Sequence, residues 1–126
     1  MREALVDTIL GCIVGGAIGD AAGASFEGSP NCSSPLVLNG ADWHLTDDTQ
    51  LTLATCEALT QHGTPDPAHI AASFLRWFRA RRLTGLGAST LKALLDLEAG
   101  AHWALAGRKG EHAAGPDSLS LKRLHV

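Results

Sequence analysis

The chain has 126 residues, of which 45% are hydrophobic, 18% are charged and 5% are aromatic. This apolar content is too high for a disordered chain, and the length suits one small domain. The net charge of −3 excludes the strongly basic field that draws a protein to nucleic acid or to an anionic membrane surface. We therefore expect neither nucleic acid nor a membrane among its partners.

The three cysteines, Cys12, Cys32 and Cys56, are odd in number and too widely spaced for a zinc or redox motif. Cys12 and Cys56 stand among apolar neighbours, where a buried, reduced thiol is the usual state. These features indicate a reducing compartment, and we expect a cytoplasmic protein.

The N-terminal segment is apolar and rich in glycine. A signal peptide is disfavoured because Arg2 is offset by Glu3 and Asp7. Asp20 interrupts the apolar run and leaves it too short to span a bilayer comfortably. The helical spacing of its apolar residues predicts a soluble core helix over residues 2–19. Its small residues favour close packing in the interior: Gly11, Gly15, Gly16, Gly19 and Gly23.

A loop and a second helix follow. Residues 20–39 are rich in Gly, Ser, Pro and Asn, which predicts a loop. The next helix is expected to begin at Asp47 or Asp48 and to run to about His62, where Gly63 is a plausible stop.

The third helix has the clearest start signal in the chain. Asp66 can cap it and Pro67 suits its first turn. One apolar stripe follows at helical spacing: Ile70, Phe74, Trp77 and Phe78. The end of this helix is rich in arginine, which we interpret as a solvated helix end rather than a nucleic-acid patch: Arg76, Arg79, Arg81 and Arg82.

A turn over residues 85–87 precedes the fourth predicted helix, which Ser89 or Thr90 would cap and which would run to Gly100. A short helix is expected over residues 101–106. The chain has no internal repeat and no convincing strand, so the predicted fold is all-α.

The run Thr46-Asp47-Asp48-Thr49 lies at the junction between the loop and the second helix. One interpretation is a helix cap, in which Asp47 accepts a backbone N–H and Gln50 closes a capping box. The other is a site for a hard cation, because adjacent carboxylates repel each other and Mg²⁺ prefers oxygen ligands. The residues alone leave both interpretations open.

A second motif favours the metal site. Residues 15–28 contain Gly19-Asp20-Ala21-Ala22-Gly23 at the end of a small-residue helix, with Glu27 close behind. This run, followed by the Thr-Asp-Asp-Thr motif, resembles the N-terminal signature of the ADP-ribosylglycohydrolase family, which includes dinitrogenase reductase-activating glycohydrolase. Residues 85–87 and 102–111 are also similar to the family, so the resemblance covers residues 8–115.

The resemblance implies an all-α domain that binds two Mg²⁺ ions, or Mn²⁺ in some members, together with ADP-ribose. Members hydrolyse the glycosidic bond that joins ADP-ribose to arginine, serine or another acceptor. By position, Thr46, Asp47 and Asp48 match the family's first group of metal ligands, and Glu27 matches a glutamate that contacts the metal or acts in catalysis. We therefore expect Glu27, Asp47 and Asp48 to be catalytic. In such a signature, Asp20 caps or braces the loop.

After residue 115 the sequence departs from the family pattern, which continues with an Asn-Gly loop, a Met-Arg pair and a second acidic motif. Here Pro116 follows, and Asp117 is the last acidic residue. We expect residues 1–115 to be the N-terminal part of an ADP-ribosylglycohydrolase-like domain that is incomplete at the C-terminus. We expect residues 116–126 to form a loose tail.

An incomplete domain would bind Mg²⁺ weakly and have little hydrolase activity. It would expose apolar helix faces, such as residues 74–78 or 91–95, and these favour self-association. One alternative is a non-catalytic relative, either a structural protein or a binder of ADP-ribose or nucleotide. An unrelated metal-dependent phosphohydrolase is disfavoured because it leaves the Gly-Asp-Ala signature unexplained.

Overall fold

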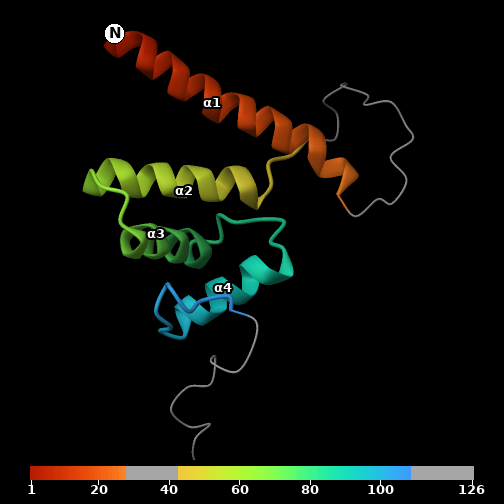
Figure 1. Ribbon diagram of the computed structural model, residues 1–126. Helices are drawn as coiled ribbons and strands as arrows, with labels where there is room; N and C mark the ends of the chain where they lie inside the picture. The colour runs from red at the N-terminus through yellow and green to blue at the C-terminus, as the bar shows by residue number, and fades with distance from the viewer. Residues whose placement is uncertain (28–42, 109–126) are drawn as a thin grey trace, which may run out of the picture.

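The computed structural model describes residues 1–27 and 43–108 (Figure 1). Within these ranges the fold is helical and has no strand, which confirms the all-α prediction. The elements in chain order are α1 (Arg2–Gly23), the 3-10 turn η1 (Ala24–Phe26), α2 (Asp47–His62), α3 (Pro67–Arg79) and α4 (Ala88–Glu98).

The helices form a stack in chain order (Figure 1). α1 packs on α2, α2 packs on α3, and α3 packs on α4. The α2–α3 interface is the most extensive of the three. Three small residues are buried there, Ala54 and Ala58 of α2 and Ser73 of α3, together with the large Trp77 of α3. The small side chains allow the two helix backbones to approach closely, and the Ser73 hydroxyl donates to the Ala54 carbonyl over 2.8 Å.

The boundaries of α2 agree with the prediction, but the cap does not. Thr46, rather than Asp47, is the N-cap residue, and its Oγ1 accepts the backbone N–H of Asp48 over 3.3 Å. Gln50 closes no capping box, because its side-chain amide is bonded to Thr84. At the other end, Gly63 adopts the left-handed conformation (φ 71°) that commonly terminates a helix.

α3 begins as predicted. The Asp66 carboxylate accepts the backbone N–H of Ala68 over 2.8 Å, and Pro67 occupies the first turn. Trp77, in the predicted apolar stripe, is buried, so that stripe is not an open apolar face. The four arginines at the end of α3 are exposed, in agreement with a solvated helix end. One of them, Arg82, lies over the Trp77 ring at 3.7 Å from its centroid.

α4 and the residues after it differ from the prediction. α4 follows Gly87 with no side-chain cap, so neither Ser89 nor Thr90 caps it, and it ends at Glu98. Leu94 is buried, whereas Leu91 and Leu95 are exposed.

Residues 101–106 form turns instead of the predicted helix. Asp96 holds this segment onto α4, because its Oδ2 accepts both the Gly107 N–H at 3.0 Å and the Lys92 ammonium at 2.7 Å. The predicted tail of residues 116–126 lies outside the described residues.

α1 departs most from expectation. It continues to Gly23, so Asp20 is helical and does not begin a loop. The sequence pattern predicts that this helix lies in the interior of the protein. Within the described residues this is wrong, because α2 is the only other α-helix that packs on α1. Its large apolar side chains are exposed: Leu5, Val6, Ile9, Leu10, Val14 and Ile18. The expectation that Asp20 leaves this run too short to span a bilayer is wrong as to length, because Asp20 lies inside the helix. By length and composition, the segment Arg2–Phe26 could cross a membrane, a property that signal sequences and the core helices of soluble proteins share.

The thiols of Cys12 and Cys56 are both free. The predicted burial of Cys12 is wrong, since it is exposed on α1, and Cys56 is half-buried. Cys32 lies outside the described residues.

Candidate metal-binding site at the start of α2

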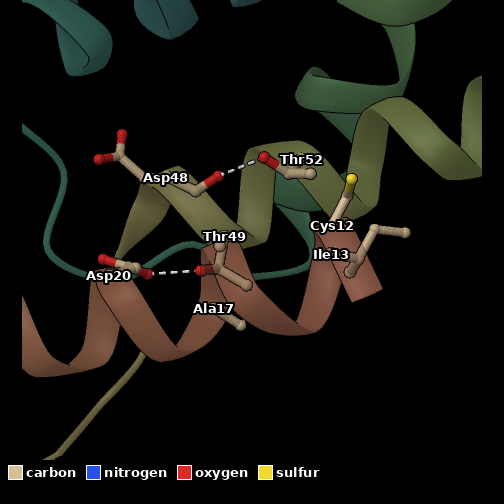
Figure 2. A pocket seen from close by; sticks show the side chains of 8 residues that line it. Cys12, Ile13, Ala17, Asp20, Asp48, Thr49 and Thr52 are labelled. Carbon is tan, nitrogen blue, oxygen red and sulfur yellow. Dashed lines mark hydrogen bonds between the residues drawn. The ribbon is translucent and has the colours of Figure 1, made fainter. Parts of the chain in front are cut away.

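The end of α1 meets the start of α2 through one aspartate, Asp20. Its Oδ1 accepts the Thr46 hydroxyl over 2.5 Å. Its Oδ2 accepts the Thr46 backbone N–H at 2.9 Å and the Thr49 hydroxyl at 2.6 Å; Figure 2 shows this last bond crossing between the two helices. The bracing role expected for Asp20 agrees with the structure, although Asp20 acts from inside a helix.

The environment of Asp20 keeps it ionised at neutral pH. Burial raises the pKa of its carboxyl. The hydrogen bonds from Thr46 and Thr49 together lower this pKa by more than burial raises it, so the net shift is downward. Both threonines are buried, at 5% and 6% exposure, so water competes poorly for these bonds. Asp20 is therefore a fixed negative group whose two oxygens are already used as acceptors.

A cavity of about 350 Å³ lies between α1 and the first turns of α2 (Figure 2). α1 contributes small and apolar residues to its lining, and both helices contribute polar ones. The lining residues are Cys12, Ile13, Gly16, Ala17, Asp20, Asp48, Thr49 and Thr52. Of the predicted metal ligands, Asp48 lines this cavity, whereas Thr46 and Asp47 are not among its lining residues.

Asp47 and Asp48 occupy the first turn of α2, where the helix dipole favours negative charge. Asp47 is half-buried and Asp48 is exposed. Among residues 1–27 and 43–108, neither carboxylate forms a hydrogen bond or an ion pair. They therefore differ from Asp20, whose oxygens are occupied, and both remain available to a ligand.

Glu27 follows η1 and is exposed. Within the described part of the chain, no hydrogen bond or ion pair joins its carboxylate to Thr46, Asp47 or Asp48. The structure thus brings three of the four predicted site residues together at one helix start, and it does not join Glu27 to them.

Two further side chains hold the site, and the sequence pattern alone does not reveal them. Gln50 and Thr84 exchange hydrogen bonds and tie the first turns of α2 to the loop after α3. In the same loop, Gly85 lies so close to Thr46 that a Cβ on Gly85 would be 3.8 Å from the Thr46 Cβ. Residues 34 positions apart carry no local signal of such pairing.

The donor set fits a hard cation. Thr46, Asp47 and Asp48 offer only oxygen atoms, which Mg²⁺ and Mn²⁺ prefer over nitrogen and sulfur. No group of three or more His, Cys, Asp or Glu side chains that could hold a metal occurs in the two described ranges. These residues could therefore supply only some of the six oxygens that Mg²⁺ takes, and water or other oxygens would supply the rest.

Comparisons with known proteins identify the family. The profile of the ADP-ribosylglycohydrolase family matches residues 1–122. Over 110 residues the chain is 33% identical to an uncharacterized protein of Archaeoglobus fulgidus, covering 76% of this chain and 35% of that protein. The chain thus spans about a third of the length of this relative. No solved structure matches. The extent of the family match shows that the chain belongs to the ADP-ribosylglycohydrolase family.

Proposed function

We propose that the protein is a Mg²⁺-dependent glycohydrolase that cleaves the bond between ADP-ribose and an acceptor on a protein or a small molecule. The family match supports the glycohydrolase class. The observation that carries the proposal is the pair of carboxylates, Asp47 and Asp48, which have no partner in the described residues and stand at the start of α2.

The charge of the substrate explains why a cation is needed. ADP-ribose carries a diphosphate, and two carboxylates would repel it, by about 4 kcal/mol for two unit charges ~4 Å apart at an effective dielectric of ~20. Asp47, Asp48 and Thr46 would hold Mg²⁺, which would supply positive charge to bind and polarise oxygens of the substrate. By holding the cation in one place, Asp47, Asp48 and Thr46 would also fix the position of the bound ribose relative to the attacking water.

The proposed reaction is hydrolysis at the anomeric carbon of the ribose. A water oxygen forms a bond to this carbon while the bond from the carbon to the acceptor atom breaks. The acceptor leaves with the bonding electron pair and gains a proton, and the attacking water loses one. We assign Glu27, an exposed carboxylate beyond η1, to accept the proton from water.

The test is release of ADP-ribose from peptides modified on arginine or on serine, with Mg²⁺, with Mn²⁺ and with a chelator. We expect slow release that depends on the cation. Asp47→Ala and Asp48→Ala should each lower the rate by at least about 100-fold, because each removes a ligand of the cation. Glu27→Gln should lower the rate by about 10²- to 10⁴-fold, the range for loss of a general base, while leaving cation binding intact.

A matched control is Asp66→Asn, which removes one acidic charge at the start of the next helix while keeping a residue that can cap it. This variant should retain the rate. Cation-dependent binding of ADP-ribose without release from any substrate would contradict the proposal and favour a non-catalytic binder.

A further inference from the structure

We propose that Asp20 is a positioning residue that orients the Thr46 hydroxyl so that its oxygen can bind the cation. The inference rests on the proposed function, and it gives Asp20 a role separate from that of Asp47 and Asp48. The geometry around a single hydroxyl group carries it.

A hydroxyl has one hydrogen and two acceptor lone pairs. The hydrogen of Thr46 Oγ1 is directed to Asp20 Oδ1, 2.5 Å away. One lone pair accepts the Asp48 backbone N–H at 3.3 Å. The other lone pair has no donor among the described residues, so it is the position that a cation can occupy.

The Asp20 carboxylate is well held in this orientation. Its second oxygen accepts the Thr46 N–H and the Thr49 hydroxyl, so rotation of the carboxylate would break three hydrogen bonds at once. A carboxylate can only accept hydrogen bonds, and it therefore keeps the Thr46 hydrogen pointing away from the cation. Asp20 Oδ2 accepts two hydrogen bonds, so both of its lone pairs are used to hold the carboxylate in place.

A simpler role for Asp20 would be to tie α1 to α2 with no effect on the cation. Asp20→Asn separates the two roles because it preserves size and hydrogen-bonding capacity. The amide oxygen can replace Oδ2 and accept from Thr46 N and Thr49, whereas the amide NH₂ must face Thr46 Oγ1. It would donate to that oxygen, take the remaining lone pair and turn the hydroxyl hydrogen toward the cation.

The experiment measures Mn²⁺ binding to the 126-residue chain by electron paramagnetic resonance, and Mg²⁺ binding by competition with Mn²⁺. Asp20→Asn should weaken binding by about 10- to 100-fold, the usual effect of altering a group that orients a metal ligand. The matched control is Asp66→Asn, the same kind of substitution at the start of α3, where the Asp66 carboxylate accepts the Ala68 N–H rather than a bond from Thr46 or Thr49. It should change the affinity less than about 3-fold, a limit well below that usual range.

A double-mutant cycle with Thr46→Val tests whether Asp20 acts through Thr46. The double variant should bind Mn²⁺ no more weakly than Thr46→Val alone. Circular dichroism verifies folding, and trimethylamine N-oxide can restore the folded fraction of any destabilised variant before the titration.

The outcomes separate the two proposals. If the parent chain binds Mn²⁺ and Asp20→Asn binds equally well, the positioning role is overturned and the proposed function stands. Additive losses in the cycle would also overturn the positioning role. If the parent chain binds neither Mn²⁺ nor Mg²⁺, both proposals fail together.

Discussion

Gln50 and Thr84 exchange two hydrogen bonds between the first turns of α2 and the loop after α3. The Gln50 Nε2 donates to Thr84 Oγ1 over 2.6 Å, and the Thr84 backbone N–H donates to Gln50 Oε1 over 2.7 Å. The two bonds join residues that are 34 positions apart in the sequence. It also fixes the loop that contains Gly85, the neighbour of Thr46.

Gln50→Ala should therefore destabilise the protein. Both hydrogen bonds to Thr84 are lost, together with a long one of 3.4 Å to the Leu45 carbonyl. At about 0.5–1.5 kcal/mol for each bond to Thr84, the expected decrease in the free energy of unfolding is about 1–3 kcal/mol. Urea denaturation followed by circular dichroism measures it. Thr60→Ala is the control, because the Thr60 hydroxyl bonds only to a carbonyl of its own helix; it should cost less than about 0.5 kcal/mol. Equal effects of the two variants would show that the Gln50–Thr84 pair contributes nothing specific.

Two glycines with positive φ, Gly63 and Gly107, allow the cost of backbone strain to be measured separately from the cost of a steric contact. Gly63 has φ 71° and open space where a methyl group would be added, whereas a Cβ on Gly107 (φ 76°) would lie 3.0 Å from the Ala93 Cβ. Gly63→Ala should cost about 1–2 kcal/mol from backbone strain alone. Gly107→Ala should cost more, because it adds the contact with Ala93.

The control for the glycine pair is Gly11→Ala in the middle of α1, where the backbone is helical and the space is open. This change should stabilise the chain by up to about 1 kcal/mol, in line with helix propensity. Thermal unfolding of all three variants gives the comparison. A Gly107→Ala variant that is no less stable than Gly63→Ala would contradict the role of the Ala93 contact.

Local signals explain which boundaries can be predicted from the sequence. Asp66-Pro67 at the start of α3 and Gly63 at the end of α2 act on backbone groups within a few residues of themselves, so a short pattern is sufficient. The cap of α2 is also local, because Thr46 accepts the Asp48 N–H, but the bonds from Thr46 to Asp20, which is 26 residues away, have no local signal. The loop predicted at Asp20 is wrong for the same reason, since nothing local marks its bonds to α2.

The exposure of α1 depends on what packs against it, and this is also beyond a local pattern. Its apolar and glycine-rich sequence is typical of an interior helix, yet α2 covers only part of it within the described residues. For the site, family resemblance identifies Thr46, Asp47 and Asp48, and the structure places them at one helix start. The positioning contacts of Asp20, Gln50 and Thr84 require three-dimensional information.

The close approach of α2 and α3 predicts that enlarging a buried alanine is costly. Ala54 is fully buried, and its carbonyl accepts the Ser73 hydroxyl over 2.8 Å. Ala54→Leu should force the two helices apart and lower the free energy of unfolding by about 1–3 kcal/mol. Ala72→Leu, on the exposed face of α3, is the matched control and should be within about 0.5 kcal/mol of the parent. Chemical denaturation distinguishes them, and equal stabilities would show that the interface is not closely packed at Ala54.

Glu57 and Trp77 predict how the stability changes in acid. The Trp77 indole N–H donates to Glu57 Oε2 over 2.6 Å, and this bond is the main reason why the pKa of Glu57 is lowered, with Arg76 adding a smaller effect. A carboxyl with a lowered pKa in the folded state stabilises the protein above its unfolded pKa and loses this contribution as the pH falls through the folded value. The free energy of unfolding should therefore decrease between about pH 5 and pH 3.

Trp77→Phe keeps an aromatic ring at this position and removes the N–H donor, so the decrease in stability between neutral pH and acid should become smaller. Urea denaturation at a series of pH values measures the slope. Trp103→Phe is the control, because Trp103 is exposed and forms no bond to Glu57; its slope should equal that of the parent. Since Asp20 and Asp96 also have lowered pKa values, part of the acid dependence should remain in Trp77→Phe. An unchanged slope in Trp77→Phe would show that the Glu57–Trp77 hydrogen bond does not contribute to the acid sensitivity.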